Sequence, residues 1–314
     1  MGIGFSRAMP TQSQMTAADE STTVAVTGAT GFVGRAVVHQ LLAAGYRHVV
    51  AIARKAPAPA LAADGVIFRA ADLGNSTDAC TALADCHMVI HLIGIIRPTA
   101  RQSFQKAHVT VTENTIFAMR KLGIRRLVHM SALGTRAGTA STYHQTKWAA
   151  EQRILQSDLD ATIIRPGLII GEGGEFTQML DAWSRGSIPP FLFMPYFGRG
   201  LLGQTGANIA PVRVEDVARL FQWCLDRPVS IGKIYELSGP RQFTWPEFLR
   251  LYAVTHHGRR RIAQGIPGWL GKILGHLPGL PFTTDQVVMA MENSTTDDAN
   301  LKTDMPDFFS RDVF

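Results

Sequence analysis

Three glycines at a fixed spacing limit what this chain can fold into more than any other feature of its sequence. They lie in the segment 27–34, Thr-Gly-Ala-Thr-Gly-Phe-Val-Gly, which follows a β-branched run at 23–27 and precedes a helical pattern at 35–44. In a strand–turn–helix unit, the first glycine permits the tight turn, the second lets a ligand approach the backbone, and the third lets the helix pack closely. The N–H groups that begin such a helix attract an anion such as a pyrophosphate.

This context predicts a dinucleotide-binding turn rather than a turn that merely needs glycines. We expect the cofactor to contact these residues: Thr27, Gly28, Thr30, Gly31, Phe32, Val33, Gly34 and Arg35. An Asp or Glu after the second strand would bind the ribose 2′-OH of NAD, whereas a basic residue accommodates the 2′-phosphate of NADP. This chain has Arg54 and Lys55 there, with Arg35 as a further cation. NADP(H) is therefore favoured over NAD(H), the alternative being that Arg54 and Lys55 are ordinary exposed loop residues.

The rest of the chain alternates short apolar runs with helical stretches. The runs that predict strands are 23–27, 48–53, 66–69, 88–93, 127–131 and 162–165, and those that predict helices are 35–44, 77–84, 103–121 and 142–156. Strands this short and continuously apolar are buried on both faces, as in a parallel sheet covered by helices. The pattern is typical of a Rossmann-type doubly wound α/β fold, here with a smaller C-terminal substrate lobe.

The domain organisation follows from where this regularity breaks. Residues 1–22 read as a disordered tail, with Met15 as an alternative start, and 23–167 as the NADP(H)-binding Rossmann domain, to which 207–238 return. Residues 168–206 and 239–314 form the predicted substrate lobe and C-terminal segment. The stretch 171–211 is rich in Gly, Pro and aromatic residues, which predicts loops of a lobe or lid, although a hydrophobic partner surface would look the same. Pro246 is expected at the first position of a helix over 247–254.

A second motif carries chemistry. Tyr143 and Lys147 are four residues apart and so share one face of a predicted helix, and Ser131 ends the strand before them. An unperturbed Tyr has a pKa near ~10 and is a poor base at neutral pH, whereas a nearby ammonium group would lower that pKa. Tyr143 is then a usable acid or base for a hydroxyl or carbonyl group. We therefore predict Ser131, Tyr143 and Lys147 as the catalytic residues, with Tyr143 and Lys147 also contacting the cofactor.

Composition excludes several other classes of protein. The net charge of +6 and pI of about 9.5 would suit an anionic partner, but the cations are scattered apart from the run 259–261, so no nucleic-acid binding is expected. The three cysteines form no C-x-x-C pair, which argues for a reducing compartment and against a metal site or a disulfide framework. No apolar run approaches the ~20 residues of a membrane span, and 1–22 lack a secretory signal. A cytoplasmic location is expected.

Together these motifs resemble the short-chain dehydrogenase/reductase superfamily, in particular its extended branch of epimerases and dehydratases. The resemblance covers most of the chain from residue 22 onward. It implies cofactor contacts at the ends of three further strands, namely Asp72, Leu73, His91, Leu92, Ile93 and Pro166, and a hydrogen bond from Ser131 to the reacting oxygen. Extended members usually carry an Asn in the helix before the Ser, for a proton relay to the Lys. Here His108 stands in its place; it can donate and accept protons, or mark a site without turnover.

Several segments narrow the resemblance to one branch. They include 90–97, 128–134, 164–167, 211–218, 235–240 and 281–286. The combination is similar to the nucleotide-binding accessory subunit of respiratory complex I and its stand-alone bacterial relatives, some of them associated with quinone metabolism. In that branch the resemblance implies that NADPH stabilises the fold or an assembly, and it implies no established substrate.

Three functions therefore remain open. The first is an NADP(H)-dependent oxidoreductase or epimerase acting on a small hydroxyl or carbonyl compound. The second is a non-catalytic accessory or assembly protein, peripheral to a membrane complex at the inner membrane, and the third is an NADP(H) redox sensor. Homodimer contact through 103–121 and 142–156 is a further expectation from the resemblance. The basic-amphipathic segment 266–280 can lie on a membrane or a partner, but we expect its apolar face to pack on the protein's own lobe, because Gly268, Gly271 and Gly275 weaken an independent helix.

Overall fold

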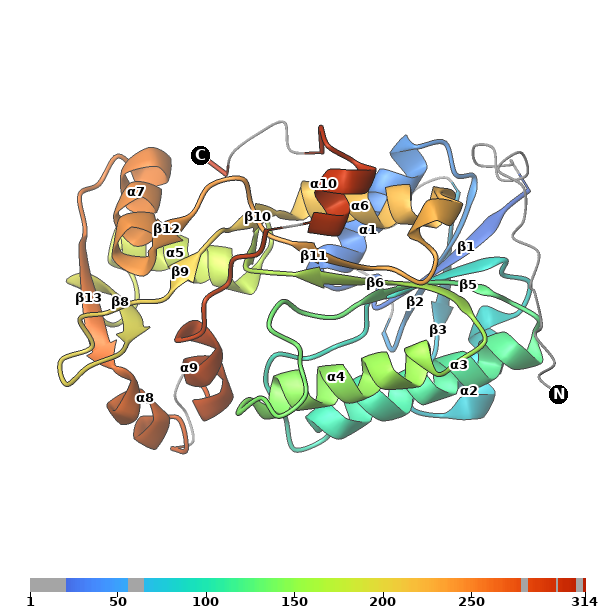
Figure 1. Ribbon diagram of the computed structural model, residues 1–314, viewed down its shortest axis with the longest axis horizontal. Helices are drawn as coiled ribbons and strands as arrows, with labels where there is room; N and C mark the ends of the chain where they lie inside the picture. Colours follow the sequence, from blue (N-terminus) through green and yellow to red (C-terminus); the bar gives the residue numbers. More distant parts are fainter. Residues whose placement is uncertain (1–20, 56–64, 278–281, 298, 309–312) are drawn as a thin grey trace, which may run out of the picture.

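A seven-stranded parallel sheet forms the centre of the molecule (Figure 1). The computed structural model describes residues 21–55, 65–277, 282–297, 299–308 and 313–314, so most of the predicted tail and the end of segment 266–280 lie outside the described residues. The sheet order is β11-β6-β5-β4-β1-β2-β3, and every neighbouring pair is parallel. The strands are β1 (Thr23–Thr27), β2 (His48–Ala53), β3 (Val66–Ala70), β4 (Met88–His91), β5 (Arg126–Met130), β6 (Asp160–Pro166) and β11 (Ile234–Leu237). This confirms the predicted doubly wound fold.

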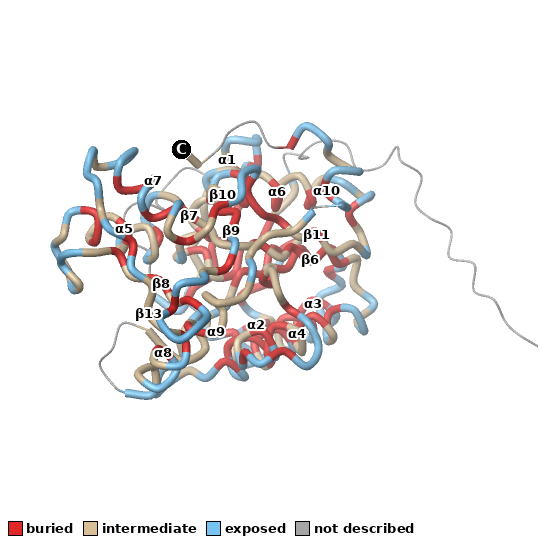
Figure 2. The backbone as a smooth tube through the Cα atoms, turned by 60° about the vertical axis from the view of Figure 1, so that its left-hand side comes forward, coloured by how far each residue is buried: buried red, intermediate tan, exposed pale blue. Residues whose placement is uncertain are grey.

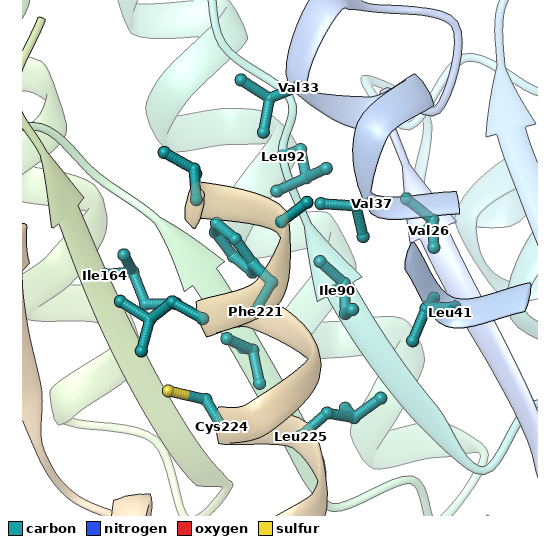
Figure 3. Packing of buried hydrophobic residues seen from close by; sticks show 14 of the residues in the cluster. Val26, Val33, Val37, Leu41, Ile90, Leu92, Ile164, Phe221, Cys224 and Leu225 are labelled. Atoms are coloured by element: carbon teal, nitrogen blue, oxygen red, sulfur yellow. The ribbon is translucent and has the colours of Figure 1, made fainter. Parts of the chain in front are cut away.

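Helices cover both faces of this sheet, as the continuously apolar strands require. The helices are α1 (Phe32–Ala43), α6 (Val214–Asp226) and the short α10 (Ala299–Asp304) on one face, and α2 (Ser76–Leu83), α3 (Val111–Lys121) and α4 (Thr142–Leu155) on the other (Figure 1). A hydrophobic core lies on each face of the sheet, and alternate residues of a strand belong to opposite cores. Val24 and Val26 of β1 pack with α1 and α6, and Ala25 packs with α2 and α3. In Figure 3, Phe221 of α6 lies between Val37 of α1 and Ile164 of β6.

The strand order reverses between β1 and β4. From β1 the chain proceeds outward through β2 to β3, returns to the centre for β4, and then proceeds through β5 and β6 in the opposite direction. Where two such halves diverge, the loops after the carboxyl ends of the central strands leave a crevice in which open α/β sheets bind ligands. The predicted glycine turn follows β1, so the topology places it at this position.

The remaining elements build a lobe at one end of the molecule (left in Figure 1). It contains α5 (Glu175–Arg185), α7 (Trp245–His257), α8 (Gly268–Leu274) and α9 (Thr284–Ala290), with the parallel pair β8 (Phe193–Gly198) and β13 (Ile262–Pro267) and the antiparallel pair β9 (Asn208–Ile209) and β12 (Phe243–Thr244). The short parallel pair β7 (Ile169–Ile170) and β10 (Val212–Arg213) connects it to the sheet. Figure 2 shows the central sheet buried and much of the lobe exposed.

Two features of this lobe differ from the sequence analysis. Residues 171–211, where loops were expected, also contain α5 and β8, and Gly186 (φ +70°) caps the C-terminal end of α5. The many glycines and prolines of this stretch hid the apolar positions of α5, among which Leu180 and Trp183 are buried in the lobe core. Pro246 also occupies the second rather than the first helical position, since α7 begins at Trp245. A capping box between Thr244 and Glu247 sets that start.

Candidate nucleotide and reaction site

The turn after β1 has the geometry that a pyrophosphate needs. Gly28 adopts φ +72°, which favours glycine, and its N–H donates to the Ile52 carbonyl at 2.9 Å. A Cβ on Gly34 would lie 2.2 Å from the Gly28 carbonyl oxygen, so only a glycine lets α1 pack this closely on the turn. Gly31 begins α1, which has neither a side-chain cap nor an acidic residue in its first turn. The N–H groups at this helix start therefore suit an anion, and the cradle fits a dinucleotide phosphate.

We expect Gly34→Ala to remove nucleotide binding. The new Cβ would meet backbone atoms of Gly28 and Ala29 that cannot give way, so α1 must move from the turn and take its N–H groups along. Such overpacking costs about 1–3 kcal/mol of unfolding free energy. Thermal unfolding with and without NADPH measures both effects. Gly123→Ala is the control for a glycine substitution away from the turn, because Gly123 has open space around it; its φ of +72° should make alanine cost about 1 kcal/mol, while the stabilisation by NADPH should remain. Normal NADPH stabilisation of Gly34→Ala would contradict this account of the turn.

The predicted cofactor-selecting cations lie at the carboxyl end of β2. Arg54 and Lys55 follow the strand directly and are exposed. Arg35, expected as a further cation, instead donates from Nη1 to the Thr30 carbonyl at 2.8 Å, so it also supports the turn. Asp72 does not end β3, which stops at Ala70; it is exposed, and its Oδ1 accepts from the Gly74 N–H. Leu73 beside it is buried.

His91, predicted to contact the cofactor, ends β4 next to the glycine turn. It is completely buried, with Nδ1 2.8 Å from Thr27 Oγ1 and Nε2 3.2 Å from Thr112 Oγ1. These bonds connect β4 to β1 and to α3, just beneath the glycine turn. The next two residues, Leu92 and Ile93, contact the turn more directly: the Leu92 N–H donates to Thr27 Oγ1 at 3.2 Å, and the Ile93 nitrogen lies 3.3 Å from where a Cβ on Gly28 would be. Pro166, at the end of β6, accepts from the Leu133 N–H.

The predicted catalytic residues lie at the ends of β5 and α4. Ser131 is buried directly after β5, and its Oγ lies 3.4 Å from Thr135 Oγ1. Tyr143 is half-buried in the first turn of α4, which Ser141 caps by accepting from the His144 N–H. Lys147 lies one turn further on the same helix and is 2% exposed. Its Nζ donates to the Met130 carbonyl at 2.9 Å and so connects α4 to the strand end beside Ser131.

The pKa values of Tyr143 and Lys147 differ from those expected of an activated tyrosine. Burial raises the pKa of Tyr143 to about 12, and no cation offsets this effect. Burial also lowers the pKa of Lys147 to about 8, which the Glu151 carboxylate partly opposes. Lys147, whose ammonium group donates to the Met130 carbonyl, therefore does not lower the pKa of Tyr143 as expected. In this state Tyr143 is suited to hold and donate a proton rather than to accept one.

His108, which stands where an Asn was expected, is built into the same site. Its ring packs edge-on against Tyr143 with ring centres 5.3 Å apart. Its Nε2 lies 3.1 Å from both the nitrogen and the carbonyl oxygen of Ile95, and its Nδ1 lies 2.8 Å from Thr146 Oγ1, so both ring nitrogens have hydrogen-bond partners. Burial, reinforced by the Lys147 charge, lowers the pKa of His108 to about 2. Neutral His108 therefore holds Tyr143 and α4 in place.

The sequence interpretation missed His129, one residue before the end of β5. It is 1% exposed and stacks on His91 with ring centres 5.2 Å apart. Neither of its ring nitrogens has a hydrogen-bond partner among the described residues. We refer to His91, His108 and His129 as the histidine cluster. Strand alternation could have revealed it, because His91 and His129 are register partners on neighbouring parallel strands and their side chains share a face.

The C-terminal segment also reaches this site. The Thr142 N–H, at the start of α4, donates to Asp285 Oδ1 of α9 at 2.7 Å. Arg136, in the loop between β5 and α4, pairs with Glu292 just after α9 at 3.1 Å. The loop that carries Ser131 and Tyr143 is therefore attached to the lobe by Asp285 and Glu292, two residues to which the sequence analysis gave no role. These contacts depend on tertiary packing alone.

A glycine turn at the switch point of a parallel sheet, beneath an uncapped helix start, defines an NAD(P)-binding Rossmann protein. Residues 28–188 match the family model described as NAD(P)H-binding, so this chain belongs to that family. Two open grooves, of about 510 and 470 Å³, lie on the lobe, and neither is lined by a predicted site residue.

Similar proteins confirm the resemblance to short-chain dehydrogenase/reductase-like proteins and to complex I subunits. The chain is 31% identical over 247 residues to the mitochondrial NADH dehydrogenase [ubiquinone] 1 alpha subcomplex subunit 9 of Arabidopsis thaliana, covering 72% of this chain but only 59% of that protein. It is 30% identical over 237 residues to a ceramide reductase of Caulobacter vibrioides, covering 74% of this chain and 70% of that one.

Solved structures confirm the fold. An NADPH-dependent quinone oxidoreductase of Escherichia coli, complexed with NADPH, matches with a TM-score of 0.69 at 21% identity, covering 90% of this chain and 94% of the other. A UDP-glucose 4-epimerase of Thermotoga maritima matches with a TM-score of 0.66 at 16% identity, covering 90% and 92%. At these identities the match concerns the architecture.

Proposed function

We propose that this protein is an NADP(H)-dependent oxidoreductase that acts on a small carbonyl or hydroxyl compound through Ser131, Tyr143 and Lys147. The observation that carries the proposal is the attachment of buried Lys147 to the Met130 carbonyl, which fixes α4 against the end of β5 and brings Tyr143 and Ser131 to the same edge of the sheet. A bound nicotinamide supplies or accepts a hydride at the substrate carbon. Ser131 Oγ orients the substrate oxygen, and Tyr143 Oη donates a proton to it when a carbonyl becomes a hydroxyl.

Two features support the direction of reduction. Tyr143 is protonated at neutral pH, as the proton donor of a reduction must be, whereas oxidation would need it to act as a base, which its raised pKa disfavours. Relatives named ceramide reductase and NADPH-dependent quinone oxidoreductase also favour a carbonyl substrate. An epimerase would need the same residues, but it would have to return the hydride to the same substrate.

A non-catalytic accessory role is the second candidate, and a specific observation favours it. Nothing lowers the pKa of Tyr143, while His108 packs on its ring. Several relatives are subunits of mitochondrial complex I. In this role NADPH would stabilise the fold and with it an assembly at the inner membrane.

The nucleotide that stays bound through purification separates the two roles. An oxidoreductase must release its cofactor after each turnover, so we expect any retained nucleotide to exchange with added NADPH within seconds to minutes. Mass analysis identifies the nucleotide, and loss of its fluorescence against excess NADP measures the exchange. NADPH that survives long dialysis without exchange would overturn the catalytic proposal and support the accessory role.

The NADP preference depends on Arg54 and Lys55. We expect the double variant Arg54→Ala, Lys55→Ala to bind NADPH roughly 10- to 100-fold more weakly, because hydrogen bonds to a charged group contribute about 1.5–3 kcal/mol. NADH affinity should change little, since NADH lacks the 2′-phosphate. Titration calorimetry with both nucleotides measures the ratio, and Lys121→Ala, at the end of α3, is the control for lost charge. Recovery of NAD alone from the wild-type protein, or equal weakening for both nucleotides, would refute this role for Arg54 and Lys55.

A further inference from the structure

We propose that the outer end of the lobe binds the surface of an anionic lipid bilayer. This end, the lobe tip, comprises α8 with the following Leu277 and the hairpin 198–205 between β8 and β9. The proposal is independent of the catalytic role of Tyr143, because it depends on the exposure and charge of a different surface. None of the described helices is long and apolar enough to span a membrane, so binding here would be peripheral.

Helix α8 exposes two of its large apolar side chains, and a third follows its end. Trp269 and Ile273 are four residues apart on the helix, which places them on one side, and Leu277 comes after Leu274, where the helix ends; the three are 53%, 60% and 56% exposed. The helix packs on the lobe through Gly268 and Gly271 instead. The expectation that its apolar side packs on the protein's own lobe was therefore wrong for Trp269, Ile273 and Leu277, whereas Leu270 and Leu274 are half-buried.

The glycines are the physical reason for this orientation. A Cβ on Gly268 would lie 1.9 Å from Met291 Sδ, and one on Gly271 would lie 2.7 Å from the Phe197 ring. Only a glycine side of α8 can approach the lobe this closely. Trp269 and Ile273, on the side away from these glycines, therefore face outward.

A second exposed apolar element lies beside this helix. Leu201 and Leu202, in the hairpin that the Arg199–Thr205 bridge closes, are 76% and 69% exposed. Trp269 Nε1 lies 3.5 Å from the Leu201 carbonyl oxygen, so the two elements are in contact. Isolated exposed apolar residues are normal on a protein surface, but five large ones on adjoining elements form a patch.

The charges around the patch identify its partner as anionic. A groove of about 510 Å³ between the hairpin and α8 is lined by Arg199 and Lys272 together with Leu201 and Trp269, and its lining contains no carboxylate. Arg199 is held in place by donating from Nη2 to the Met291 carbonyl at 3.0 Å.

A lipid–water interface has the matching chemistry. Phosphate headgroups suit the two cations, the acyl region suits the leucines and Ile273, and tryptophan favours the boundary between them. A bilayer presents a plane to the lobe tip, whereas a protein partner would need a surface that matches this short, projecting tip. The small apolar area and the few cations together predict weak, reversible binding that needs both contributions.

Vesicle sedimentation with the full chain tests the proposal. We expect binding to vesicles of phosphatidylcholine mixed with phosphatidylglycerol, little binding to phosphatidylcholine alone, and release as the salt concentration rises. The variant Trp269→Ser, Ile273→Ser should bind at least about tenfold more weakly because it loses most of the buried apolar area. Lys272→Glu should also weaken binding, and its exposed charge makes it a safe substitution if the apolar variant does not fold.

Matched controls come from the Rossmann domain. Phe117 on α3 is 52% exposed, so Phe117→Ser removes an exposed apolar side chain elsewhere, and Lys121→Glu reverses a charge on the same helix. Both should bind vesicles like the wild type. Absence of binding to the anionic vesicles at low salt would overturn the proposal, as would equal losses in the control variants. Self-association that disappears in Trp269→Ser, Ile273→Ser without any vesicle binding would also overturn it, in favour of a second copy as the occupant.

Discussion

Acidification below about pH 6.5 should destabilise this protein steeply, because the histidine cluster is buried in its neutral form. Burial lowers the pKa of His91 to about 3 and that of His108 to about 2, and it holds the pKa of His129 well below its usual value. Lys147 lowers all three further, because its charge opposes a second positive charge nearby. Among the described residues, no carboxylate contacts these rings to compensate.

The direction of the effect follows from proton binding. Below pH 6.5 the unfolded chain protonates these histidines while the folded protein does not, so the unfolded state binds more protons and the free energy of unfolding falls as the pH falls. The stability is fully present above 6.5 and is lost progressively toward the folded pKa values. Each buried histidine contributes a slope of up to about 1.4 kcal/mol per pH unit, and the cluster about 4 kcal/mol per pH unit. With ordinary stabilities of about 5–15 kcal/mol, this slope should unfold the protein at about pH 5 for the lower stability and at about pH 3 for the higher one.

Urea unfolding at pH 7.5, 6.5 and 5.5 measures this slope. The variant His129→Phe keeps an aromatic ring against His91 and removes one titrating group, so it should lose about a third of the slope. His39→Gln is the control, because His39 is exposed on α1 and should leave the slope unchanged. A stability that stays constant from pH 7.5 to 5.5 would show that the cluster is solvated or already charged.

The second large effect is expected for Tyr143→Phe. This variant should reduce turnover by a factor of about 10² to 10⁴ while leaving the fold and nucleotide binding intact. A positioned proton donor contributes a factor of this size, and Phe keeps the ring contact with His108 but removes the proton that Tyr143 would donate. The measurement is NADPH oxidation with a carbonyl substrate found by screening quinones and long-chain ketones, at several pH values.

Two further variants make this result interpretable. Ser131→Ala should reduce turnover less strongly, because Ser131 orients the oxygen without supplying its proton. His108→Asn restores the amide expected at this position and tests whether the ring matters for turnover or only for stability. If cells and extracts that contain a stable Tyr143→Phe protein are indistinguishable from those with the wild type, catalysis by Tyr143 is not the role of this protein. That result would agree with an accessory function.

Much of the fold was predictable because its signals are local. Short, continuously apolar runs predicted the strands β1 to β6 of the central sheet, and β1 and β2 begin and end at the predicted residues. The glycine turn was also predictable, since Gly28 and Gly34 are required by backbone geometry within one segment. Helix α5 was missed because its sequence lies among glycines and prolines that normally indicate loops.

The chemistry of the site was less predictable than its position. The i, i+4 spacing predicted that Tyr143 and Lys147 share one helix face. It could not predict the bond from Lys147 to the Met130 carbonyl, because Met130 belongs to strand β5. A pKa depends on burial and on every neighbouring charge, and these arise only when distant segments meet. The histidine cluster combines residues from β4, β5 and the π-helical segment Gln105–Thr110 for the same reason.

By itself, therefore, the sequence determined the doubly wound sheet, the nucleotide turn and the residue types available for chemistry, because each depends on neighbouring residues along the chain. Tertiary structure alone decided which groups are charged, which side of α8 is exposed and how Asp285 and Glu292 hold the loop that carries Ser131. The physical reason is that burial and electrostatic environment are properties of packed surfaces rather than of segments. For α8, two glycines that disfavour a helix in isolation allowed close packing and turned Trp269 and Ile273 outward.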